Sequence, residues 1–224
     1  MENLGLQKHL SKTFIWMFVG IMITAIVSWF AAQSLDFQLL IYENPACIFF
    51  AFIVELILVI MFNTMGINQM NPTLSKILYV LYSSVTGLTF SVIFLVYELG
   101  SIWLAFVVTS LYFGALALFG YKTSIDLTKF ASIAIFGLIF MIVTELILII
   151  IGFRGATLLF AGIGIIIFSI LTAFDVQKIK ILYEQNKESE IGLETIALYS
   201  AFQLYLDFIN LFLEILKFFG KRRD

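Results

Sequence analysis

The sequence has few charged residues, and this scarcity excludes an ordinary soluble fold. Only 12% of the 224 residues are charged and 62% are hydrophobic, whereas about a quarter of the residues of soluble domains are charged. The mean hydropathy is +1.06. A helical span needs roughly 20 apolar residues to cross the hydrocarbon core of a bilayer. The chain is therefore expected to lie in a membrane, with room for about seven spans.

Cysteine, histidine and basic clusters are also scarce. The single cysteine, Cys47, has no partner for an internal disulfide, and the single histidine, His9, lies near the amino terminus away from any zinc-protease or triad pattern. No basic block is longer than residues 221–223, and the net charge is −2. These absences argue against an enzyme, against a bound metal cluster or other cofactor, and against nucleic acid as a partner.

Seven long apolar runs are present, and they predict an all-α integral membrane protein. They are continuous rather than alternating, which excludes a transmembrane β-barrel. The first run is longer than the apolar region of a signal peptide and is expected to remain as the first helix. No linker separates two parts, so residues 1–224 are predicted to form a single domain. The predicted spans are Thr13 to Ala32, Pro45 to Phe62, Ile77 to Val96, Ile102 to Phe119, Phe130 to Ile151, Ala156 to Phe174 and Thr195 to Phe219.

The distribution of lysine and arginine predicts the orientation of the chain. Lysines occur in the amino-terminal tail and in the second, fourth and sixth loops, which places these segments on the cytoplasmic side. The first and third loops carry acids without a basic residue and belong outside. Seven crossings then put the basic residues 221–223 outside, against the same rule. Either the last helix crosses anyway or it turns back.

Polar residues follow one face of the last span. Gln203, Asp207, Asn210 and Glu214, with Lys217 near the end, are separated by four, three, four and three positions, which is the spacing of one helix face. An acid at mid-bilayer costs about 2.5 to 3.5 kcal/mol on insertion scales, so this face is expected to avoid lipid. We expect a centrally placed helix whose polar face lines a buried cavity.

Three further acids lie in or beside predicted spans. Asp175 falls where span six ends, at the cytoplasmic interface, and could meet Asp207 only if the last helix begins well inside the cytoplasm; otherwise it is a solvated residue at a helix end. Glu55 lies near the middle of span two and is assigned to the pathway. Glu145 lies nearer the outer end of span five, where pairing with Arg154 would explain it as well as a function would.

Two carboxyl groups that share a site cannot both ionise cheaply, so they bind protons as one coupled unit. A pair formed by Asp175 and Asp207 would therefore act as a pH switch. Carboxylate oxygens are also the hard ligands that Ca²⁺ prefers, and the pair could make transient Ca²⁺ contacts. The residues alone leave an ion leak, a proton-coupled antiporter and a proton relay open.

Several segments resemble motifs of the Bax inhibitor family, the transmembrane Bax inhibitor motif proteins, and most closely those of its bacterial branch. The resemblance extends over nearly the whole chain, in the expected order. The matching segments are residues 86–91 (TGLTFS), 120–123 (GYKT) with Asp126-Leu127, 173–179 (AFDVQKI) and 204–213 (LYLDFINLFL).

This resemblance implies seven helices, with two three-helix layers around a central carboxy-terminal helix. It also implies a pH-sensitive passive calcium leak gated by a hydrogen-bonded aspartate pair, which maps onto Asp175 and Asp207. Glu55 matches an acidic position in the second helix, and Gln203, Asn210 and Glu214 would be supporting residues. The alternative is a non-conducting modulator of a membrane protease or a stress-response partner. The expected location is the bacterial inner membrane, with calcium ions, protons and lipid as partners.

Two positions depart from the family pattern. Members commonly carry Arg or Lys just after span two, where residues 66–68 of this chain are Gly-Ile-Asn. Phe174 replaces the usual tyrosine beside the first aspartate and removes a hydroxyl group. The pH dependence is therefore expected to differ from that of relatives.

Overall fold

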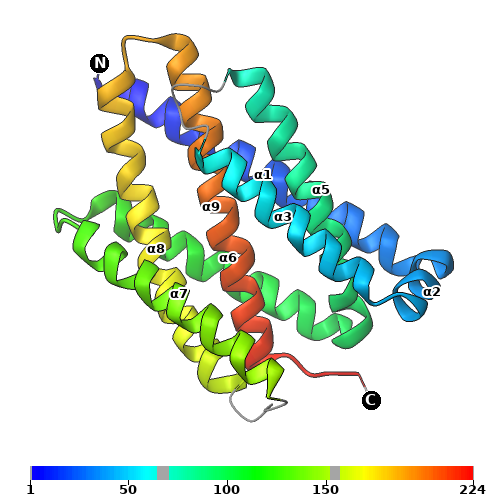
Figure 1. The fold of residues 1–224 in the computed structure, drawn as a ribbon. Coiled ribbons are helices and arrows are strands. Elements are labelled where there is room, and N and C mark those ends of the chain that lie inside the picture. Colours follow the sequence, from blue (N-terminus) through cyan, green and yellow to red (C-terminus); the bar gives the residue numbers. More distant parts are fainter. Residues whose placement is uncertain (1, 65–70, 152–156, 224) are drawn as a thin grey trace. The chain divides into compact units, whose positions relative to one another are not determined.

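The computed structural model describes residues 2–64, 71–151 and 157–223, most of which are helical (Figure 1). Seven of the eight helices in these residues are long and apolar enough to cross a membrane, and the exception is the short α2. The predicted all-α membrane fold is confirmed. The helices are α1 (Glu2–Gln33), α2 (Leu35–Glu43), α3 (Ala46–Thr64), α5 (Pro72–Val96), α6 (Leu99–Lys122), α7 (Thr128–Ile150), α8 (Thr157–Asn186) and α9 (Glu190–Phe219).

Side-chain caps fix the start of two helices. The Asn71 side chain accepts a hydrogen bond from the backbone N–H of Leu74 at 2.8 Å, and Pro72 opens α5, where a missing N–H costs nothing. Ser34 caps α2 in the same way through the N–H of Phe37. α2 was not predicted, because nine residues are too few to stand out in a search for spans.

Two helices extend more than ten residues beyond their apolar runs. α1 begins at Glu2 rather than Thr13, so His9 lies in a helix, buried, with its ring centroid 5.4 Å from that of Tyr183. α8 continues to Asn186 rather than ending at Phe174. The polar residues that follow Phe174 are mostly good helix formers and include no proline or glycine. Hydropathy therefore located the apolar part of each helix and not its end.

The chain forms two compact units. Unit 1 contains residues 1–97, 182–205 and 222–224, and unit 2 contains residues 98–181 and 206–221. Each unit holds three of the first six spans, in agreement with the predicted two sets of three, and α9 contributes its first half to unit 1 and its second half to unit 2. The layers around α9 and the single domain over residues 1–224 stay predictions.

In unit 1, α5 packs along α1 and against α3, while α2 contacts α1 and α3. The fully buried Tyr79 of α5 donates a hydrogen bond to the carbonyl of Trp16 at 2.9 Å. Gly20 makes this approach feasible, because a Cβ there would overlap the Tyr79 hydroxyl. The hydroxyl groups of Tyr205 and Thr24 are 2.6 Å apart. The core of unit 1 therefore contains several aromatic side chains, and the hydroxyl groups of Tyr79 and Tyr205 are hydrogen-bonded.

Three segments predicted on the cytoplasmic side meet in unit 1. The carboxylate of Glu194, at the start of α9, lies 2.7 Å from the ammonium of Lys76 at the start of α5 and 3.9 Å from that of Lys12 in α1. The amino-terminal segment, the second loop and the sixth loop thus share one end of the unit.

In unit 2, the second half of α9 packs on α6 through Phe208, whose ring centroid lies 5.7 Å from that of Phe106 and 5.5 Å from that of Phe113. Gly120 of α6 lies against the backbone of Ala173 in α8, so closely that a Cβ would overlap the Ala173 carbonyl. This contact fixes α8 against α6 two residues before Asp175.

The carboxy-terminal tail binds the loop between α5 and α6. The N–H of Arg223 donates to the carbonyl of Val96 at 2.9 Å in unit 1, and the N–H of Glu98 donates to the carbonyl of Lys221 at 2.9 Å in unit 2. α9 therefore starts beside the beginning of α5, at Glu194, and its tail reaches the end of α5. α9 is one continuous helix and does not turn back, and the side of the membrane on which residues 221–223 lie stays a prediction.

Candidate carboxyl site

The predicted polar line lies on one helix, α9, in which most residues are buried. Asp207 is 5% exposed and Glu214 is 5% exposed. Gln203 and Asn210 are half-buried. The spacing argument is confirmed in so far as all four residues belong to one continuous helix and avoid full exposure.

Asp207 meets Asp175 in unit 2. Their carboxyl groups are close enough to hydrogen-bond to one another, and the negative charge of Asp175 acts on Asp207. Oδ2 of Asp207 is buried and has no hydrogen-bond partner within the described residues. Two acids that lie 32 positions apart in the sequence, one on α8 and one on α9, therefore share one site.

The expected position of Asp175 at the end of span six is wrong. α8 continues for eleven residues beyond it, to Asn186, and α9 begins at Glu190, seventeen residues before Asp207. Both acids therefore lie well inside their helices. α9 begins five residues before the predicted span at Thr195, and its start inside the cytoplasm stays a prediction.

A lysine one turn along α8 contributes to the site. The positive charge of Lys178 acts on the Asp175 carboxyl group, and its ammonium lies 6.0 Å from the centre of the Phe174 ring. The phenyl ring that replaces the usual tyrosine thus faces a cation, an arrangement that is favourable for an aromatic face. Residues 66–68, where this chain has Gly-Ile-Asn in place of the family's basic residue, lie outside the described residues.

Glu55 forms a separate site in unit 1. Its Oε1 accepts a hydrogen bond from the hydroxyl group of Thr89 at 2.8 Å, which joins α3 to α5. Its charge also acts on Tyr82 and Tyr205. Glu55 is half-buried, in keeping with its prediction as an acid inside a span. Thr89 belongs to the TGLTFS segment, and no feature of the sequence singled it out as the partner of Glu55.

The supporting residues bond to groups other than Asp207. The side-chain amide of Gln203 donates to Oδ1 of Asn63 in α3 at 2.9 Å, and that of Asn210 donates to the carbonyl of Leu206 in its own helix at 2.8 Å. Asn63 was missed by the sequence analysis. Its signal is its place as the first polar residue after the apolar run of α3.

Glu214 receives a hydrogen bond on Oε1 from the ammonium of Lys217 at 2.9 Å, and its Oε2 is buried without a partner within the described residues. The negative charge of Glu145 in α7 acts on it. The predicted pairing of Glu145 with Arg154 cannot be followed, because Arg154 lies outside the described residues.

Oxygen ligands at the aspartate pair are few. In the described part of the chain no group of three or more His, Cys, Asp or Glu residues could hold a metal ion. Two carboxyl groups fall short of the six to eight oxygens that Ca²⁺ takes. A bound Ca²⁺ ion would need further oxygen ligands, such as those of water.

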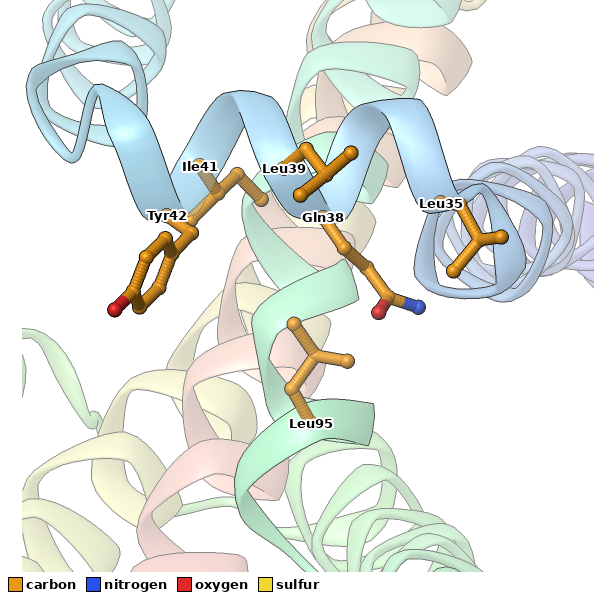
Figure 2. A pocket seen from close by; sticks show the side chains of 6 residues that line it. All are labelled: Leu35, Gln38, Leu39, Ile41, Tyr42 and Leu95. Carbon is orange, nitrogen blue, oxygen red and sulfur yellow. The ribbon is translucent and has the colours of Figure 1, made fainter.

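A hollow of about 390 Å³ lies in unit 1 between α2 and the end of α5. Figure 2 shows the side chain of Gln38 pointing from α2 towards Leu95, and Tyr42 projecting from the other end of α2. The lining is apolar apart from these two polar groups and contains no acid. An amphipathic tyrosine on a short, largely exposed helix is typical of the membrane interface. This hollow is distinct in composition from the carboxyl sites.

Seven membrane-spanning helices and a carboxyl pair within two of them define a polytopic membrane protein with an ionisable site among its spans. A family model described as "Inhibitor of apoptosis-promoting Bax1" matches residues 6–224. The chain belongs to this Bax inhibitor family, which confirms the resemblance seen in its motifs.

Relatives cover almost the whole chain. The "Inner membrane protein YbhL" of Escherichia coli strain K12 is 39% identical over 220 residues, which is 98% of this chain and 94% of that protein. A protein of Borreliella burgdorferi is 33% identical over 223 residues, 100% of this chain and 96% of its own length. A membrane protein of Streptococcus pyogenes serotype M6 is 31% identical over 222 residues, 98% of this chain and 95% of its own length.

Proposed function

We propose that this protein is a pH-sensitive, passive leak for calcium ions in the bacterial inner membrane, gated by Asp175 and Asp207. The observation that carries the proposal is the contact between these two carboxyl groups, one buried and one half-buried, in helices that span the membrane. The location is supported by the seven spans and by the printed name of the Escherichia coli relative. We propose transport, and not catalysis, as the role of the site.

The pair can serve as a gate because of its proton chemistry. A hydrogen bond between two carboxyl groups exists only when one of them carries a proton. With that proton, Asp175 and Asp207 hold α8 to α9. When the proton leaves, two negative charges in a low-dielectric site repel one another, and their oxygens become ligands for a cation. Proton loss would then open the path and create its attraction for Ca²⁺.

Glu55 is a second acid that we assign to ion passage, at its own site in unit 1. Its carboxylate is half-buried and is held by the hydroxyl group of Thr89. Because a carboxylate inside a span is costly, a role with a passing cation gives a reason for its presence.

Calcium flux into liposomes tests the proposal. Purified protein is reconstituted with a trapped calcium indicator, and uptake is measured over a series of external pH values. We expect flux that rises as the pair loses its proton, and we expect Asp207→Asn to flatten this pH dependence, because an amide cannot titrate. Asp126→Asn is the matched control, since Asp126 is an exposed aspartate that bonds to the N–H of Thr128 outside the spans.

Two outcomes would count against the leak. Flux no greater than in empty liposomes at every pH would defeat it and leave the non-conducting modulator, in which case a membrane partner should be sought. A pH dependence that Asp207→Asn leaves intact would separate conduction from the aspartate pair.

A further inference from the structure

The loop between α6 and α7, residues 123–127, contains family motif residues to which the aspartate gate assigns no role. Within this loop the hydroxyl group of Thr123 accepts a hydrogen bond from the N–H of Ile125 at 3.2 Å. The side chain of Leu127, at the end of the loop, is buried. The loop therefore has a defined conformation and can serve as an attachment point for a neighbouring helix.

The side chain of Gln177 binds this loop to α8. Its amide donates from Nε2 to the carbonyl of Ile125 at 2.8 Å and accepts at Oε1 from the N–H of Leu127 at 3.0 Å. A side-chain amide offers the same donor and acceptor as a peptide group, so it can pair with the loop backbone on both sides. One turn further along α8, Lys180 donates to the carbonyl of Tyr121 at 2.6 Å, at the end of α6, where helix carbonyls lack partners.

Asp175 lies between two attachments of α8. Two residues before it, Ala173 meets Gly120 of α6 so closely that a Cβ at the glycine would overlap the Ala173 carbonyl. Two residues after it, Gln177 binds the loop. At a rise of 1.5 Å per residue, the two attachments are about 6 Å apart along the helix, with Asp175 midway. The position of α8 at Asp175 is therefore restrained by α6 and by the loop that follows α6.

We propose that Gln177 is the positioning residue of the aspartate gate, because it holds α8 on the α6–α7 loop and so keeps Asp175 in contact with Asp207. This inference rests on the proposed function. The charged groups that act on the pair are the two carboxyl groups themselves and Lys178 of α8, while α6 contributes the uncharged Gly120. Gln177 is neutral, so its influence is geometric. A firmly held pair keeps its shared proton to higher pH, because the two carboxylates cannot separate when the proton leaves.

Infrared spectroscopy of the protein in lipid bilayers tests the proposal, because a protonated carboxyl group absorbs apart from a carboxylate. The part of that band which Asp207→Asn removes belongs to the pair, and its loss is followed as the pH rises. Gln177→Met keeps the net charge and lacks the amide. We expect this variant to lose the band at a pH about 0.5 to 1 unit lower, the equivalent of about one hydrogen bond. Gln185→Met, at an exposed glutamine of the same helix, is the control and should leave this pH unchanged.

Hydrogen exchange of the loop is the second readout. In Gln177→Met the N–H of Leu127 loses its acceptor, and its exchange should become about fivefold faster, again the equivalent of one hydrogen bond. If Gln177→Met does not fold, Gln177→Asn carries the same test, because its amide is one carbon too short to reach both backbone groups.

Three results would overturn the proposal. Loss of the band at the same pH in Gln177→Met and in the parent would show that Gln177 binds the loop without positioning Asp175. Unchanged exchange at Leu127 would show that the amide does not hold the loop. A band that Asp207→Asn leaves intact would mean that the pair holds no proton, and would overturn the gate as well.

Failure of the leak is distinguishable from failure of this proposal, because neither readout requires calcium flux. If the parent passes no calcium and the band still shifts in Gln177→Met, the leak fails and the positioning role of Gln177 stands. If calcium flux depends on pH as proposed and the band does not shift, the leak stands and the positioning role fails.

Discussion

The two halves of α9 treat their polar side chains differently. In the first half, which belongs to unit 1, the polar groups from Thr195 onward are neutral. Gln203 donates to Asn63 at 2.9 Å, and the hydroxyl of Tyr205 lies 2.6 Å from that of Thr24, whereas the buried hydroxyl of Ser200 has no partner within the described residues. In the second half, which belongs to unit 2, Asp207 and Glu214 are acids, and each has a buried oxygen without a partner within the described residues.

This difference separates structural from functional polarity in one helix. Neutral polar groups with hydrogen-bond partners stabilise the packing of a membrane helix without placing a charge in the membrane. An acid with an unbonded oxygen costs stability, and proteins keep such groups where ionisation is used. If this distinction is correct, removing a polar group from the first half of α9 should lower the free energy of unfolding. Removing an acid from the second half should not lower it.

The largest effect is expected from Gly120, which positions α8 beside Asp175. Gly120→Ala places a Cβ against the carbonyl of Ala173, and backbone cannot rotate away as a side chain can. We expect the free energy of unfolding to fall by about 3 kcal/mol, near the upper end of typical overpacking costs. Denaturation in mixed micelles measures this loss.

Gly114 of the same helix is the matched control. A Cβ at this position meets no atom within 4 Å. Gly114→Ala should therefore raise helix stability by about 0.5 to 1 kcal/mol, because alanine loses less conformational entropy than glycine. Equal losses at both positions would mean that the contact with α8 does not set the stability of unit 2.

The second prediction is a gain in stability instead of a loss, and it tests the difference between the two halves of α9 directly. Asp207→Asn removes a buried ionisable group beside Asp175 but keeps the size and an amide donor. We expect the free energy of unfolding to rise by about 1 kcal/mol, since replacing buried charged groups is often neutral or stabilising. The same micelle assay applies at neutral pH. A loss of more than about 1 kcal/mol would show that the aspartate pair is structural, like the first half of the helix.

The third prediction concerns the first half. Tyr205→Phe removes a hydroxyl group from a fully buried ring and leaves Thr24 without that partner. The expected loss is about 0.6 kcal/mol, the average for hydrogen bonds between membrane helices. Thr24→Val should cost a similar amount, although the Thr24 hydroxyl also donates to the carbonyl of Ser83. In the double variant the two losses should be less than additive, because both remove one bond.

Much of this arrangement could be predicted from sequence. The spans follow from local composition, and the polar line of α9 follows from spacing alone, so Asp207 and Glu214 were identified without a structure. The motif around Asp175 pointed to the correct partner. These signals are local, or repeat at a helical period, and a single chain carries them in full.

Other features depend on contacts that no local pattern encodes. The end of the helix that carries Asp175 was misjudged because a helix can continue through residues such as Gln177 and Lys178 after its apolar run ends. The burial of Glu214 depends on the space that Gly164 of α8 leaves for it, and the bond from Gln203 to Asn63 joins two residues 140 positions apart in the sequence. Packing of distant segments decides such pairs, and hydropathy is blind to it.

The smallest effect is expected at the carboxy-terminal tail, which follows the end of α9 and belongs to neither of its halves. The ammonium of Lys221 lies 2.8 Å from Oε1 of Glu98, and this contact raises the pKa of Lys221 above its ordinary value of 10.5. The contribution of the pair is therefore fully present below pH 10.5 and is lost as the pH rises through the higher value.

Because both side chains are largely in solvent, Glu98→Gln should speed proteolysis of the tail by less than about fivefold. The backbone bonds from Glu98 to Lys221 and from Arg223 to Val96 remain in this variant and should hold the tail. Protease added to the outer face of spheroplasts measures both this rate and the predicted side of the tail. Cleavage only after the cells are opened would place the tail inside and contradict the assigned orientation.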